Sequence, residues 1–177
     1  MKGTVRNSVT LITVLLLAAL VNIASAQTSE GIVVGTFDSR CVAAAYYRSA
    51  DFMDEINALK AEHNAAEEAG DTELVEALAA RGEEKQHLAH TQVFSSGDIE
   101  EIIWLIWGEL PGVAQEAGVD IIVSVWDIIY MKDSMRFVDV TDRLVSFFDP
   151  TDETLELIVE MKKVPPIPGP MLPEDSH

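Results

Sequence analysis

The sequence predicts an α+β protein, in which a long, coiled-coil-like helical hairpin protrudes from a small β-sheet body. Short β-branched runs bounded by turn residues lie near both ends of the chain, at 31–37 and 119–126. Between them, a helical pattern without proline or glycine runs from residue 40 to about 69, and a second one follows. Because a single strand is not stable alone, the first run must pair with strands after residue 119. The helices between these strands are therefore expected to form an insertion.

The N-terminal element has the pattern of a secretory signal peptide, residues 1–26. Lys2 and Arg6 form its positive region, an apolar run spans residues 11–21, and Ala24-Ser25-Ala26 is a small-x-small cleavage site. The apolar run is shorter than the roughly 20 residues that cross a bilayer, so we expect cleavage after Ala26 and not a membrane anchor. The expected location is the periplasm.

Charge and cysteine usage exclude several classes of protein. The chain has 12 Lys and Arg against 30 Asp and Glu, and loss of the signal peptide leaves 10 against 30, a net charge of −20. Such acidity argues against nucleic-acid binding and against strong binding to anionic membranes. The single cysteine, Cys41, excludes an internal disulfide and a multi-cysteine metal site. We expect it to be a buried apolar residue, with intermolecular pairing as the alternative.

The two long helices are expected to fold back on each other at Gly70-Asp71. Gly70 suits a helix C-terminus and Asp71 the next N-cap. The first helix has a seam with steps of four and three residues, formed by Val42, Tyr46, Ser49, Met53 and Ile56. The second, from residue 72 to about 93, has a thin apolar face, so the hairpin should be largely solvated and its tip open to proteases.

A third helical segment begins near Ile99 and ends at Gly118, with an interruption expected at Pro111-Gly112. Residues 99–110 are apolar nearly all round, and such a helix must be buried. We therefore expect a homo-oligomer, specifically a trimer.

The C-terminal part is predicted to return to strands and then to helices. The strands are expected at 119–126, 128–130 and 137–140, and the helices at 141–148 and 153–163. Residues 27–163 would form one domain, and the proline-rich residues 164–177 a flexible tail.

Three segments resemble the Skp/OmpH family of periplasmic chaperones. They are Ile32-Val-Val-Gly-Thr-Phe37, Gly118-Val-Asp-Ile-Ile-Val123, and the ending in which Tyr130-Met-Lys-Asp133 precedes Val138-Asp-Val-Thr-Asp-Arg-Leu-Val145. The resemblance covers roughly residues 31–148. It implies a homotrimer whose strands build a barrel-like body, with helical arms around a cavity that holds unfolded outer-membrane proteins without ATP.

Three features depart from that family. The hairpin, from 39 to about 117, is short and interrupted, the mature chain is acidic where well-known members are basic, and the helix at 153–163 with its tail extends past the usual end. A second function therefore stays open, that of a structural or adaptor protein of the cell envelope that keeps the fold without binding clients.

Several side-chain groups could carry chemistry, but each has a simpler structural explanation. His87 and His90, with Glu83, Glu84 and His63, could hold a divalent metal ion, but a solvated helix face explains them better. The same holds for the acidic cluster Glu62, Glu67, Glu68, Asp71, Glu73 and Glu76, which lacks the spacing of a calcium loop. We expect no metal site and no cofactor.

No nucleophile motif of a hydrolase is present, so we expect no enzyme. Asp38 with Asp127 or Asp133 could form an acid–base pair, although strand-end aspartates are more often caps. Trp104 and Trp107 could stack on a ligand, but an oligomer or core seam is the favoured interpretation. The nearest approach to a basic pair, Arg136 and Arg143, is surrounded by acidic residues: Asp133, Asp139 and Asp142.

Overall fold

A computed structural model describes residues 31–168, which combine helices with a small sheet. This agrees with the predicted mixture of helix and strand. The predicted signal peptide, residues 1–26, and the last residues of the predicted tail lie outside the described residues. Within residues 31–168, no helix is both long enough and apolar enough to cross a membrane.

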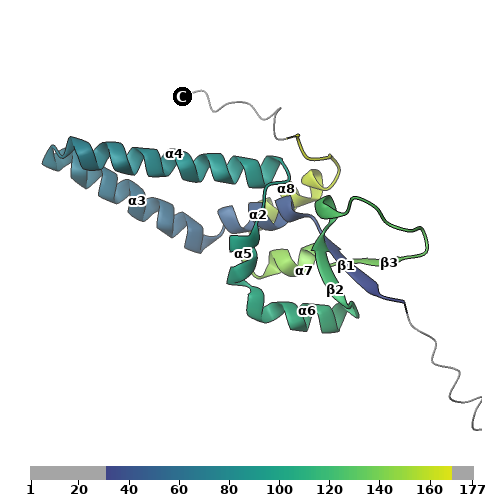
Figure 1. Cartoon of the computed structure of the whole chain (residues 1–177). Helices are drawn as coiled ribbons and strands as arrows, with labels where there is room; N and C mark the ends of the chain where they lie inside the picture. The colour runs from purple at the N-terminus through teal and green to yellow at the C-terminus, as the bar shows by residue number, and fades with distance from the viewer. Residues whose placement is uncertain (1–30, 169–177) are drawn as a thin grey trace, which may run out of the picture. The chain divides into compact units, whose positions relative to one another are not determined.

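The sheet has three strands in the order β2-β1-β3, with β1 (Val33–Phe37) between β2 (Ile121–Ser124) and β3 (Arg136–Asp139). Both neighbours run parallel to β1, and Gly35 lies opposite Ile122 on one side and Val138 on the other. The first strand therefore pairs with strands after residue 119, as predicted, and Figure 1 shows it at the centre of the sheet.

Gly35 lets the segment around β2 approach the central strand closely. A Cβ atom at this position would lie 3.0 Å from Cγ2 of Val119 and 3.2 Å from the carbonyl oxygen of Ile121. Such contacts are tighter than carbon atoms tolerate without displacement. A side chain at position 35 would therefore push β1 and β2 apart.

The first helical segment is two helices and not the single helix predicted for residues 40–69. Helix α2 (Ser39–Tyr47) ends before Ser49, whose hydroxyl accepts the Phe52 N–H at 3.3 Å and starts α3 (Ala50–Ala69). The break changes the register of the predicted seam. Phe52 is buried, while Met53 is 44% exposed.

Helices α3 and α4 (Thr72–Phe94) form the hairpin, and they lie side by side in Figure 1. The turn is built as predicted: Gly70 has φ +71°, and Asp71 Oδ1 accepts the Leu74 N–H at 3.1 Å. A small apolar cluster joins the two helices; its buried members are Leu59, Ala66 and Leu78. The hairpin is thus residues 50–94, shorter than the predicted 39–117.

The segment after the hairpin belongs to the body. It comprises α5 (Glu100–Leu105), the 3₁₀ turn η1 (Trp107–Glu109) and α6 (Leu110–Ala117), which ends at Gly118 with φ +65°. Its isoleucine seam is buried, formed by Ile99, Ile102 and Ile106, whereas Trp104, Leu105 and Trp107 are exposed. One side of this segment is therefore not covered by the rest of the described chain.

The C-terminal part follows the prediction except at residues 128–130. No strand forms there: η2 (Val125–Asp127) follows β2, and the loop up to β3 leaves Ile129 and Tyr130 exposed. Helices α7 (Thr141–Ser146) and α8 (Asp152–Met161) follow. Beyond α8 the Ile167 N–H donates to the Phe94 carbonyl oxygen at 2.8 Å, so the start of the predicted flexible tail is hydrogen-bonded to the end of α4.

The main core lies around α2. Small residues of this helix, Cys41 to Ala45, are almost completely buried and pack near α5, α7 and α8. Aromatic rings of Tyr46, Tyr47 and Phe52 cluster where α2 meets α3. Buried Gln92 of α4 pairs with Tyr47 and with the Asp98 carbonyl oxygen, which anchors the base of the hairpin to the body.

Candidate functional site

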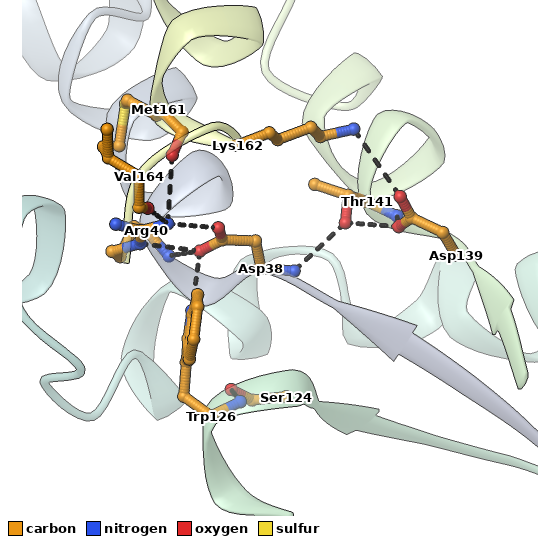
Figure 2. A network of polar contacts seen from close by, with 9 residues as sticks. All are labelled: Asp38, Arg40, Ser124, Trp126, Asp139, Thr141, Met161, Lys162 and Val164. Carbon is orange, nitrogen blue, oxygen red and sulfur yellow. Dashed lines mark hydrogen bonds and ion pairs between the residues drawn. The ribbon is translucent and has the colours of Figure 1, made fainter. Parts of the chain in front are cut away.

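The carboxyl ends of the three parallel strands bring distant polar residues to one edge of the sheet. Asp38 follows β1, Trp126 follows β2, and Asp139 ends β3 next to Thr141. In open parallel sheets this edge is where ligands commonly bind. Figure 2 shows that here the polar groups bind one another.

Asp38 is the centre of this edge network. Its Oδ2 pairs with Arg40 Nη2 at 2.7 Å, and its Oδ1 accepts from Arg40 Nε at 3.1 Å and from Trp126 Nε1 at 2.8 Å. The Arg40 guanidinium carbon also lies 4.8 Å from the centroid of the Trp126 ring. Arg40 is 3% exposed, so this ion pair is buried.

Two opposing effects set the pKa of the Asp38 carboxyl. Burial raises the pKa, because the charged form loses hydration. The hydrogen bonds from Arg40 and Trp126, together with the Arg40 charge, stabilise the carboxylate and outweigh burial, so the net pKa lies below the ordinary value of 3.8. Asp38 is therefore a carboxylate near neutral pH.

Thr141 connects β1 to the end of β3. Its hydroxyl accepts the Asp38 N–H at 3.0 Å and donates to Asp139 Oδ1 at 2.5 Å. Lys162 lies 3.7 Å from Asp139 Oδ2 and 2.6 Å from Asp142 Oδ1. Partial burial lowers the pKa of Lys162, but the hydrogen bond from Lys162 to Asp142 and the two acidic charges raise it above the ordinary value of 10.5.

Arg40 also fixes the end of α8. Its Nη2 donates to the carbonyl oxygens of Met161, at 3.2 Å, and Val164, at 3.0 Å. Among residues 31–168, no buried side-chain nitrogen or oxygen lacks a hydrogen-bond partner. The edge network thus joins strand ends to the C-terminal helix, and its geometry accounts for Asp38 as a structural residue. Asp127 and Asp133, the partners considered for an acid–base pair, are exposed.

A different kind of site lies between the hairpin helices. A groove of about 470 Å³ is lined mainly by apolar side chains, with Phe52, Ile56 and Leu59 from α3 and Leu78 and Gly82 from α4. At Gly82 a Cβ atom would meet nothing within 4 Å, so the glycine leaves this part of the groove open.

The lining of the groove also includes polar and charged residues. Lys60 and Lys85 both line it, and Lys85 Nζ is 2.7 Å from Glu55 Oε1. The groove can therefore receive an apolar segment while charged groups border it.

The histidines and the acidic cluster lie on the hairpin. His63 Nδ1 is 3.9 Å from Glu67 Oε2, and the His90 ring faces Phe94 at 5.7 Å. His87 is exposed on the same helix, and the six clustered carboxylates near the turn are all exposed. In the part of the chain that the structure describes, no group of three histidine, cysteine or acidic side chains is arranged to hold a metal ion.

The remaining candidates lie on the body. Trp104 and Trp107 stack, with ring centroids 4.7 Å apart and planes at 28°, and they are 57% and 55% exposed. The core alternative is therefore wrong for the tryptophans, although it holds for the isoleucines beside them, and an oligomer seam stays a prediction. Arg136 and Arg143 are exposed, and Arg143 Nε lies 4.0 Å from Glu116 Oε2.

Cys41 is buried, as predicted, with an exposed fraction of 0%. Burial raises the pKa of its thiol to about 12. The side chain is thus an apolar core group and a poor nucleophile.

Sequence reasoning missed the roles of Arg40, Trp126 and Thr141. The available signal was local: a strand followed by Asp38-x-Arg40 allows an ion pair across two residues, which the structure shows. Trp126 and Thr141 come from 88 and 103 residues farther along the chain, so no local pattern indicates them. In comparisons with protein-family models, curated proteins and solved structures, this chain gave no significant match.

Proposed function

We propose that this protein is an exported, holdase-type chaperone, which binds apolar segments of unfolded outer-membrane proteins without ATP. The observation that carries the proposal is the apolar groove of about 470 Å³ along the hairpin. Apolar grooves between helices are a common mode of segment binding, because burial of apolar surface needs no specific sequence. The resemblance of residues 31–148 to the Skp/OmpH family supports the same function.

Self-association into a trimer is part of this proposal. The loop that was expected to form a strand has Ile129 101% exposed and Tyr130 79% exposed. Ile128 has extended backbone angles, and β2 and β3 each leave one edge unpaired within the described sheet. Exposed apolar side chains beside open strand edges favour pairing with further copies. Light scattering at tens of micromolar tests this: a trimeric mass supports the proposal and a monomeric mass contradicts it.

The short hairpin favours a second candidate, an envelope adaptor without client binding. Helix α3 has 20 residues, which corresponds to about 30 Å. Such an arm encloses little space, and the acidic surface differs from that of basic chaperones.

An aggregation assay separates the two functions. A urea-unfolded outer-membrane β-barrel protein is diluted into buffer with increasing amounts of this protein, and turbidity is followed. The holdase function predicts suppression at a fixed stoichiometry, while an adaptor gives none.

The groove itself is tested by substitution at Gly82. Gly82→Leu fills the groove and should abolish suppression, whereas Gly82→Ala is the matched control and should retain it. Circular dichroism confirms that both variants fold. Equal activity of Gly82→Leu and the parent would show that clients do not use the groove.

A further inference from the structure

The stacked pair Trp104 and Trp107 is exposed on the body, away from the hairpin groove described above. Exposed tryptophan is unusual because burying an indole side chain gains a large amount of free energy. The two rings lie on the uncovered side of α5 and η1, whose buried side contacts the core through Ile102 and Ile106. The two rings are exposed because the opposite side of this segment packs on the core. They therefore form a surface that a partner can contact.

Each indole borders a hollow whose lining includes carboxylates. Trp104 lines one of about 460 Å³ with Asp98, Glu100 and Glu101, and Leu88 and Gln92 of α4 complete its lining. Trp107 lines another of about 500 Å³, in which Asp98 and Glu100 occur again. The rest of its lining is largely apolar, and Asp127 is its third acidic residue. The two hollows therefore share two acidic residues, and each has one of the stacked indoles in its lining. We call Trp104, Trp107, Asp98, Glu100 and Glu101 the aromatic–acidic surface.

The carboxylates of this surface keep acceptor capacity for a partner. Glu100 Oε1 accepts from Trp104 Nε1 at 3.2 Å, and Glu101 Oε1 lies 3.4 Å from Gln92 Nε2. Each of these is a single contact, and a carboxylate can accept about four hydrogen bonds. No basic side chain lines either hollow.

The charge of the surrounding sequence identifies the chemistry of the partner. Residues 86–131 contain neither lysine nor arginine, while acidic residues occur throughout this segment. Indole faces attract cations, with a preference for the guanidinium group, and neighbouring carboxylates add direct ion pairs. An acidic or neutral apolar partner would gain only from the aromatic contact and would meet uncompensated negative charge.

We propose that the aromatic–acidic surface binds an arginine- or lysine-containing segment of a partner protein, with cationic side chains on the indoles and beside the carboxylates of the two hollows. This site is separate from the hairpin groove, and the inference does not depend on the holdase function. Affinity for a basic segment is expected to fall with added salt, because exposed ion pairs are screened.

The test uses a fluorescein-labelled hexapeptide of alternating arginine and leucine, with fluorescence anisotropy as the readout. The control peptide replaces arginine by citrulline, which keeps the shape and removes the charge. The proposal predicts that the citrulline peptide binds at least about tenfold more weakly. Equal binding of the two peptides would overturn it.

Variants locate the binding surface. The double variant Trp104→Ala and Trp107→Ala should weaken arginine-peptide binding by about tenfold or more, since both rings are lost. Glu100→Gln with Glu101→Gln should weaken it and flatten the salt dependence. The matched control, Glu73→Gln with Glu76→Gln at the hairpin turn, removes the same charge elsewhere and should change affinity less than about twofold. Equal losses in the control would overturn the proposal, since overall charge would then explain binding.

A second copy of this chain is the competing occupant of the surface. Light scattering of the tryptophan double variant distinguishes it: an unchanged mass supports the partner-binding proposal, and a lower mass assigns the surface to self-association and overturns the proposal. Both tryptophans are exposed, so their removal leaves the core intact. Circular dichroism verifies this before binding is measured.

Discussion

Arg40 and Trp126 donate to the same atom, Oδ1 of Asp38, while the Arg40 guanidinium lies 4.8 Å from the centroid of the Trp126 ring. The carboxylate is therefore held between a cation and an indole that also contact each other. Arg40 reaches the end of α8 through two further hydrogen bonds. One buried side chain thus connects the central strand, the residues after β2 and the C-terminal helix.

Removal of Arg40 should destabilise the protein strongly. Arg40→Ala leaves the buried Asp38 carboxylate without its ion-pair partner, which typically costs about 3–5 kcal/mol. The matched control is Lys163→Ala, because Lys163 pairs with Glu160 at 2.5 Å and both side chains are exposed. That loss should be below about 1 kcal/mol. Urea unfolding measures both, and similar losses in the two variants would contradict the structural role of the edge network.

The Asp38 ion pair should make stability depend on acid pH. The folded-state pKa of Asp38 is lower than 3.8, so its contribution to stability is present above that pH and is lost as the pH falls through the lower folded value. Asp38→Asn removes this contribution at every pH. The difference in unfolding free energy between parent and variant should therefore shrink below pH 3.8 and stay constant between pH 5 and 7. A constant difference down to pH 2 would contradict the depressed pKa.

Two glycines should respond to alanine in opposite directions. Gly35 lies in the central strand, and Gly35→Ala places a methyl group 3.0 Å from Val119 Cγ2. This substitution should lower the free energy of unfolding by about 1–3 kcal/mol. Gly82 lies inside α4, where a Cβ atom meets no neighbour, so Gly82→Ala should stabilise the protein by about 0.5–1 kcal/mol. Thermal and urea unfolding would give opposite shifts. A neutral effect of Gly35→Ala would contradict the close approach of β2 to β1.

The Cys41 thiol should be unreactive in the folded protein. With an exposed fraction of 0% and a thiol pKa of about 12, it is shielded from reagents, and almost none of it is thiolate at pH 8. Reaction with a disulfide reagent should be slow in buffer and rapid in denaturing urea. Its rate at intermediate urea concentrations then reports opening of the core. Rapid modification without urea, or a disulfide-linked dimer, is the contrary result.

Local signals in the sequence were sufficient for most helix ends. Gly70, Asp71 and Gly118 have the conformations or capping bonds that their residue types indicate. The break at Ser49 was missed because it contains no proline or glycine, although a serine N-cap followed by Asp51 in the first turn was available as a signal. Because the prediction lacked this break, its apolar seam has the wrong helical register at Met53.

Other features of the structure depend on tertiary contacts, which local sequence patterns do not indicate. The apolar run at 128–130 has strand-like composition, but among residues 31–168 no strand pairs with it. A residue's preference for strands depends on such neighbours, so composition alone was not sufficient. The parallel direction of all three strands depends on two long-range crossovers, one through α2 to α6 and one through the loop from β2 to β3. For the edge network, the sequence indicated Asp38 as a cap, and its partners at positions 126 and 141 become visible only when the strand ends come together.

The position of β1 in the centre of the sheet has a consequence for the order of folding. Between Phe37 and Ile121 lie 83 residues, so the strand that leaves the ribosome first has no neighbour until most of the chain has been made. The hairpin, in contrast, is held by local contacts and can form while the sheet is still incomplete. Pairing across so long a separation is slow relative to local helix formation. The slowest refolding phase should therefore report assembly of the sheet, and truncation before β3 should leave β1 without one of its two neighbours.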